Sequence, residues 1–100
     1  MNPKYDTMEL VVNKADSKLE LPIPKDEGHA FVRYRIHDGQ IDLQYIEVST
    51  NLRGQGIAST LATKVFEYVA AEKLSYTILC PFLKTWKNRK DLEAEQNEAN

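Results

Sequence analysis

Residues 41–59 read IDLQYIEVSTNLRGQGIAS, and within them the hydrophobic period changes from that of a strand to that of a helix. From Ile41 to Val48 apolar and polar side chains alternate, which is typical of a half-buried strand. Residues 49–56 are polar and rich in glycine, and from Ile57 the apolar residues recur at helical spacing. The stretch therefore predicts a strand, a glycine loop and a helix in direct succession.

The side chains of this predicted strand alternate between two faces. Strict alternation assigns Ile41, Leu43 and Tyr45 to one face of the sheet. Glu47 falls on the same face as Leu43 and Tyr45. We therefore do not expect Glu47 to be an ordinary solvent-exposed charge.

An antiparallel partner is expected before this strand. Residues 30–36 alternate apolar with basic side chains, and Asp38-Gly39 is a good type I′ hairpin turn. Two shorter β-prone segments, residues 8–12 and 19–21, come earlier in the chain. Most of the sheet is therefore expected to be antiparallel.

A last strand is expected after the helix, which should end near Lys73. Residues 75–80 are compact and apolar. Because a helix crosses between the two strands, this last strand should run parallel to the one that ends at Val48. A short final helix is expected to begin within residues 82–87, and residues 91–100 are expected to fray as a tail.

The composition fits one small domain over residues 1–100, of the α+β class (α/β in the broader sense), with one long helix and a short C-terminal helix. The chain is 42% hydrophobic and 28% charged, and its net charge of −2 provides no field to attract nucleic acid or an anionic membrane. Its one cysteine, Cys80, cannot form an internal disulfide. Residues 1–6 have no apolar signal region, and no apolar run is long enough to span a bilayer. We therefore expect a cytoplasmic protein without nucleic-acid or membrane partners.

The loop before the helix has the chemistry of a phosphate site. Backbone N–H groups at the start of a helix lack internal partners and, with the helix dipole, attract anions. Gly54 and Gly56 let an anion approach the backbone, and Arg53 adds a cation. No lysine follows Gly56, which excludes a mononucleotide P-loop, and Ser59 stands where a dinucleotide fingerprint has its third glycine. A third pattern, Gln/Arg-x-x-Gly-x-Gly/Ala, fits Arg53, Gly56 and Ala58, although a plain glycine turn before a helix is the alternative.

That third pattern belongs to the GCN5-related N-acetyltransferases, and the chain resembles a branch of short, single-domain members. The resemblance runs from about Leu10 to Trp86, and a cysteine commonly ends the strand after the helix in this branch. Related chains often carry His-Thr where this chain has Tyr45-Ile46, so the histidine base of that position is absent here. The resemblance is carried by Tyr45-Ile46-Glu47-Val48, by Leu52-Arg53-Gly54-Gln55-Gly56-Ile57-Ala58 and by Cys80-Pro81-Phe82.

The resemblance implies a site for acetyl-CoA as co-substrate, with CoA as product. The pyrophosphate would lie on the backbone of the glycine loop, and the pantetheine arm between diverging strands that end at Val48 and Cys80. The thioester would then lie near Glu47, Val48 and Cys80. The expected cofactor-binding residues are Val48, Arg53, Gly54, Gln55, Gly56, Ile57, Ala58, Ser59 and Phe82.

Three side chains are candidates for catalysis. Cys80 is either a nucleophile that carries the acetyl group or a small buried residue at a strand end. Glu47 is either the base that deprotonates an amine or an edge charge. Tyr45 is either the acid that protonates the leaving thiolate or part of the sheet packing, and Tyr34 is a weaker substitute for it.

The remaining polar residues have simpler interpretations. His29 and His37 lie at opposite ends of one predicted strand, too far apart for a shared metal, and we expect both to be solvated and no metal to be bound. A basic group in the final helix faces either the 3′-phosphate of CoA, an acidic partner or solvent. Trp86 with Phe82 is expected to cover the core. The basic group consists of Lys84, Lys87, Arg89 and Lys90.

The sequence therefore predicts an enzyme, an acetyl-CoA-binding acetyltransferase that acts on an amine which the sequence does not identify. Catalysis would depend on positioning and on a backbone N–H near Val48 that polarises the thioester carbonyl. The alternative is a CoA-binding carrier or sensor without efficient transfer. A third hypothesis is an interaction domain whose glycine loop is only a turn. The oligomeric state is left open.

Overall fold

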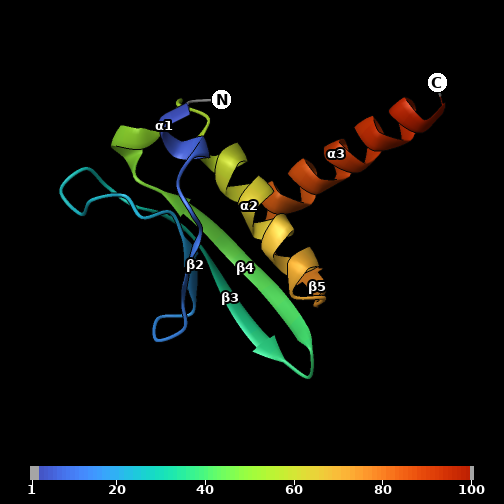
Figure 1. Ribbon diagram of the computed structural model, residues 1–100, viewed down its shortest axis with the longest axis horizontal. Helices are drawn as coiled ribbons and strands as arrows, with labels where there is room; N and C mark the ends of the chain where they lie inside the picture. The colour runs from blue at the N-terminus through green and yellow to red at the C-terminus, as the bar shows by residue number, and fades with distance from the viewer. Residues whose placement is uncertain (1–2, 100) are drawn as a thin grey trace.

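The computed structural model describes residues 3–99, which form a five-stranded sheet covered by helices (Figure 1). The long helix α2 packs against β3 and β4, and α3 packs against α2, β4 and β5. The strands are β1 (Val11–Asn13), β2 (Lys18–Glu20), β3 (Ala30–His37), β4 (Gln40–Val48) and β5 (Ser75–Ile78). The helices are α1 (Pro3–Asp6), the 3-10 turn η1 (Thr50–Leu52), α2 (Ile57–Ala71) and α3 (Pro81–Ala99).

The topology of the sheet agrees with the prediction. The strands lie in the order β1-β2-β3-β4-β5, each of the first four antiparallel to its neighbour. β5 is parallel to β4, because α2 carries the chain back between them. The fold is therefore the expected mixed, mostly antiparallel α+β arrangement.

The core lies between the sheet and α2. Leu43 and Val32 of the sheet have no solvent exposure, and neither do Leu61 and Val65 of α2. These two α2 residues are four positions apart, so they lie on the same face of the helix. The apolar stripe read from the helical period is therefore the face that α2 buries against the sheet.

A β-bulge in β4 changes which side chains face this core. Arg33 pairs with Tyr45, but the next residue of β3, Tyr34, pairs with Leu43, so Gln44 is an extra residue in β4. Leu43 is buried, whereas Tyr45 is 42% exposed. The prediction that Tyr45 and Glu47 share a face with Leu43 is therefore wrong, because the extra residue reverses the alternation.

The C-terminal helix is longer than predicted. α3 spans 19 residues from Pro81 to Ala99, so neither the short helix nor the frayed tail expected from residue 91 is found up to Ala99. Pro81 suits the first position of a helix, where its missing N–H is not needed. Lys87 Nζ then donates a hydrogen bond to Asp91 Oδ1 at 2.6 Å, one helical turn on, and this bond raises the pKa of Lys87.

The N-terminal helix α1 was not predicted. It is one turn long, and its Tyr5 is only 3% exposed. The Tyr5 hydroxyl donates a hydrogen bond to Gln55 Oε1 at 3.4 Å, and Thr60 Oγ1 donates to Asp6 Oδ1 at 3.1 Å. α1 therefore packs beside the glycine loop and the start of α2.

Candidate functional site

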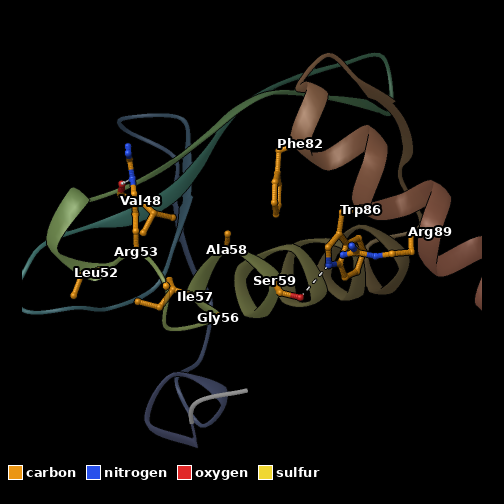
Figure 2. A pocket seen from close by; sticks show the side chains of 11 residues that line it. Val48, Leu52, Arg53, Gly56, Ile57, Ala58, Ser59, Phe82, Trp86 and Arg89 are labelled. Carbon is orange, nitrogen blue, oxygen red and sulfur yellow. Dashed lines mark hydrogen bonds between the residues drawn. The ribbon is translucent and has the colours of Figure 1, made fainter.

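A pocket of about 280 Å³ lies between the glycine loop, the first turn of α2 and the start of α3 (Figure 2). It brings together all of the residues predicted to bind the cofactor except Gln55, which is exposed and accepts the hydrogen bond from Tyr5. Leu52, Trp86 and Arg89 join them. The pocket is lined by Val48, Leu52, Arg53, Gly54, Gly56, Ile57, Ala58, Ser59, Phe82, Trp86 and Arg89.

The floor of the pocket is the N-terminus of α2. Gly54 and Gly56 have φ values of 84° and 75°, in the left-handed region that favours glycine. Gly56 is the N-cap residue, and its carbonyl accepts the first helical hydrogen bond from Thr60 N–H at 3.1 Å. Since glycine has no side chain with which to cap the helix, the first N–H groups of α2 stay available to an anion.

The first turns of α3 form the opposite wall. Phe82, Trp86 and Arg89 follow one another at helical spacing, and Figure 2 shows Phe82 and Trp86 extending from α3 toward α2. The Trp86 indole N–H donates to Ser59 Oγ at 3.1 Å. The pocket thus combines an uncapped helix start with an apolar wall and a cation, Arg89.

The pairing between β4 and β5 ends well before β4 does. The pairing of the two strands ends at Leu43 and Ile78, and Leu79 N–H makes a last hydrogen bond to the Leu43 carbonyl at 2.9 Å. β5 ends there, short of the predicted Cys80, while β4 continues to Val48. The last residues of β4 therefore present a backbone edge toward the pocket.

Backbone pairing sets the direction of the peptide groups along this edge. Ser49 N–H donates to the His29 carbonyl at 2.9 Å, so the backbone groups of Ser49, and of every second residue before it in β4, point toward β3. Ile46 and Val48 are the residues in between. Their peptide N–H groups point away from β3, toward the side where β5 has ended.

Cys80 lies in the hydrophobic core. It is 3% exposed, and it is not among the residues that line the pocket. Its carbonyl accepts the Lys84 N–H at 3.0 Å and so begins the hydrogen bonding of α3. Cys80 is therefore a small buried residue between β5 and α3.

Tyr45 and Glu47 lie on the face of the sheet opposite α2. The Tyr45 hydroxyl accepts a hydrogen bond from Arg33 Nε at 2.9 Å. Glu47 Oε2 lies 2.6 Å from His29 Nε2, and each of these two side chains is about half exposed. The structure therefore separates Cys80 from the other two predicted catalytic residues and supplies Glu47 with a histidine partner.

Sequence reasoning gave only part of this site. Trp86 lies on the core as expected, but its place in the pocket lining was not predicted. Arg89 belonged to a basic group for which the 3′-phosphate of CoA was one of three alternatives, and the i, i+4, i+7 spacing from Phe82 is the signal that places both residues in one wall. His29 was expected to be solvated, and nothing in the sequence indicated its contact with Glu47, which is set by the pairing of β3 with β4.

His37, the other histidine, is part of a surface cluster at the hairpin end of the sheet. Its Nε2 lies 2.9 Å from Asp42 Oδ2. Within residues 3–99, no group of three or more His, Cys, Asp and Glu side chains is arranged to hold a metal ion. None of the helices over this range has the length and apolar character needed to cross a membrane.

Comparison with known proteins identifies the family. A family model described as GCN5-related N-acetyl-transferase matches residues 19–96 of the 100-residue chain. No curated protein sequence matches the chain. The matched region holds the glycine loop, α2, β5 and nearly all of α3. The chain therefore belongs to the GCN5-related N-acetyltransferase family, a family of acetyltransferases.

Proposed function

We propose that this protein binds acetyl-CoA in the pocket at the start of α2 and transfers the acetyl group to an amine. The observation that carries the proposal is that the start of α2 and the unpaired end of β4 lie next to each other. An uncapped helix start between Arg53 and Arg89 suits the phosphates, and the open edge of β4 adjoins it at Val48. Acetyl-CoA as the partner fits the cytoplasmic location expected from the sequence.

The phosphates occupy the glycine-loop end in this proposal. The pyrophosphate accepts hydrogen bonds from the first N–H groups of α2 and is neutralised by the helix dipole. Arg53 is anchored by a 3.4 Å hydrogen bond from its Nε to the Val48 carbonyl. Arg89, on the opposite wall, is the cation proposed for the 3′-phosphate.

The thioester lies along the open edge of β4. The peptide N–H groups of Ile46 and Val48 point toward it, and one of them donates to the carbonyl oxygen and stabilises the charge that develops there. The pantetheine arm occupies the space that a continued β5 would fill. Transfer is direct, because the buried Cys80 thiol is poorly placed to accept the acetyl group.

Two side chains on the opposite face are proposed for the proton transfers. Glu47 takes part in deprotonation of the amine. Tyr45 accepts a hydrogen bond from Arg33, which leaves its own O–H proton free for donation to the leaving thiolate.

A second candidate function is that of a CoA-binding carrier or sensor without efficient transfer. One observation favours it: Cys80 lies in the core, while Tyr45 and Glu47 lie on the opposite face of the sheet. Such a protein would use the same pocket for CoA.

Isothermal titration calorimetry with CoA and acetyl-CoA tests the binding step. We expect saturable binding of both, and the absence of heat at millimolar ligand would overturn both candidate functions. A panel of primary amines, assayed for release of free CoA thiol, then separates them. Turnover supports the transferase, whereas binding without turnover on any amine supports the carrier.

A further inference from the structure

The face of the sheet opposite α2 carries a groove of about 520 Å³, lined by residues of β1, β2, β3 and the loop of residues 21–29. His29 and Glu47 line this groove, and they also line a neighbouring hollow of about 670 Å³ together with Val48 and Arg53. Val48 and Arg53 in turn line the glycine-loop pocket. The hollow of about 670 Å³ therefore shares lining residues both with the glycine-loop pocket and with the groove.

We propose that this groove binds the acceptor, a primary amine on an aliphatic stem, and that His29, held by Glu47, removes its proton. The inference rests on the proposed function, because the groove is assigned to the second substrate of that reaction. It adds a site and a catalytic residue, His29, that neither the sequence nor the family match indicated.

The groove already holds an ammonium group of the right chemistry. Lys18 Nζ lies 4.4 Å from the centre of the Phe31 ring, within the range of a cation–π contact. Lysine side chains are flexible, so an incoming ammonium can replace Lys18 on this ring. Asp16 and Glu20 add negative charge, and the exposed Pro22 gives an apolar surface for the stem.

The groove also contains a second lysine, Lys25, so it is not uniformly acidic. The carboxylates of the groove, Glu47 among them, offset the positive charge of the two lysines. A cation therefore meets a mixed surface whose favourable position is set by the Phe31 ring. Selectivity is expected for one ammonium at one place rather than for general positive charge.

The geometry of His29 and Glu47 suits a proton acceptor. Glu47 Oε2 lies 2.6 Å from Nε2, so the carboxylate favours the tautomer with the proton on Nε2 and leaves Nδ1 as an acceptor. The His29 ring lies 5.7 Å from the Phe31 ring, where the ammonium is bound. Its backbone is held by Ser49, whose N–H and Oγ both donate to the His29 carbonyl.

Proton transfer to His29 precedes the attack on the thioester. Nδ1 of His29 takes one proton from the ammonium, and the freed nitrogen lone pair forms a bond to the thioester carbonyl carbon. The C–S bond breaks, and its electron pair leaves on the CoA sulfur. Tyr45 then donates its O–H proton to that sulfur and takes the second proton of the amine nitrogen in its place, giving amide and CoA thiol. The imidazolium returns its proton to solvent.

The first test measures amine binding without acetyl-CoA. Pentylamine is titrated into the full chain while the NMR signals of the His29 and Phe31 rings are followed, with pentanol as the uncharged control. We expect the amine, and not the alcohol, to shift the signals of both rings, and Phe31→Leu to abolish the shift of the His29 ring. Unshifted rings, in a protein that still binds CoA by calorimetry, would overturn the groove as acceptor site and leave the CoA site intact.

The second test measures transfer to pentylamine. His29→Gln is expected to lower kcat by about 100-fold, the range of general base catalysis, with KM for acetyl-CoA unchanged. His37→Gln is the matched control and should keep wild-type kcat, because His37 is a histidine that also pairs with a carboxylate but lies at the hairpin end of β3. A wild-type rate in His29→Gln, or ring shifts in a wild-type protein that shows no turnover, would overturn the proton-acceptor role. Absence of CoA binding would instead overturn the proposed function and this role together.

Discussion

The indole N–H of Trp86 donates a hydrogen bond to Ser59 Oγ at 3.1 Å, and this bond ties α3 to the first turn of α2 (Figure 2). The Trp86 ring also stacks on Phe66, with the ring centres 5.5 Å apart and the planes 3° from parallel. Trp86 is 6% exposed. One side chain therefore joins the two helices that form opposite walls of the proposed CoA pocket.

Trp86→Phe should separate the hydrogen bond from the packing. Phenylalanine keeps an aromatic ring against Phe66 but has no N–H, so we expect a loss of about 1 kcal/mol in the free energy of unfolding. Trp86→Ala removes the ring as well and should cost about 3–5 kcal/mol. Urea denaturation measures both. Equal losses in the two variants would show that the hydrogen bond, and not the ring, holds α3 in place.

Gly54→Ala and Gly39→Ala form a matched pair. Both glycines have positive φ, 84° and 74°, and a Cβ at either position meets nothing within 4 Å. Each alanine should therefore cost about 1–2 kcal/mol of stability from backbone strain alone. Only Gly54 lies in the glycine loop of the proposed CoA site, so only Gly54→Ala should also weaken CoA binding in calorimetry. Equal CoA affinity in the two variants would remove the loop from the proposed site.

Arg89→Gln tests the assignment of the 3′-phosphate. The wild type should bind CoA more tightly than dephospho-CoA, by about 1.5–3 kcal/mol for a charge-assisted hydrogen bond. Arg89→Gln should abolish that preference without changing the affinity for dephospho-CoA. Lys84→Gln is the control, because Lys84 is an exposed residue of α3 that does not line the pocket. A preference that survives in Arg89→Gln would place the 3′-phosphate elsewhere.

Cys80→Ala should leave transfer intact. The thiol is 3% exposed and packs in the core, so its removal is expected to lower stability modestly, by about 1 kcal/mol. Acetyl transfer and CoA binding should match the wild type if transfer is direct. Mass spectrometry of the wild-type protein after incubation with acetyl-CoA provides the complementary readout. An acetyl adduct on Cys80, together with an inactive variant, would establish a covalent route instead.

Asp42 should make stability depend on acid pH. Hydrogen bonding from Gln40 is the main cause that lowers the pKa of Asp42, and the contact with His37 acts in the same direction. A carboxyl group with a lowered pKa stabilises the fold above its unfolded pKa of about 4, and this stabilisation is lost as the pH falls below that value. Asp42→Asn should therefore reduce the difference between the urea midpoints at pH 6 and pH 3. An unchanged difference would assign the acid sensitivity to other carboxyl groups.

Much of the fold is readable from local pattern. The alternation that leads to Val48, the glycines of the loop and the helical period from Ile57 are each properties of consecutive residues, and the structure has the strand, loop and helix in that order. The parallel placement of β5 follows from the crossing helix. The cofactor-binding residues predicted from the loop are also close neighbours in sequence, and for this reason all but Gln55 meet in one pocket.

Other features depend on contacts between distant parts of the chain. The extra residue Gln44 is visible only when β4 is paired with β3, and it moves Tyr45 and Glu47 to the face opposite α2. That exchange of faces is what brings Glu47 to His29, a residue of the preceding loop. Strand periodicity cannot reveal it, because alternation is a property of one strand and a bulge is a property of two.

The consecutive residues of the glycine loop and α2 thus determine the helix start that forms the proposed phosphate end of the site, and they lie within the region that matches the family. Three other features are visible only in the folded chain. They are the pocket wall formed by Trp86 and Arg89, the burial of Cys80, and the pairing of His29 with Glu47. The physical reason is the range of each interaction: a helix start is built by neighbouring residues, whereas a cavity wall or a side-chain pair is built by segments that meet only when the core forms.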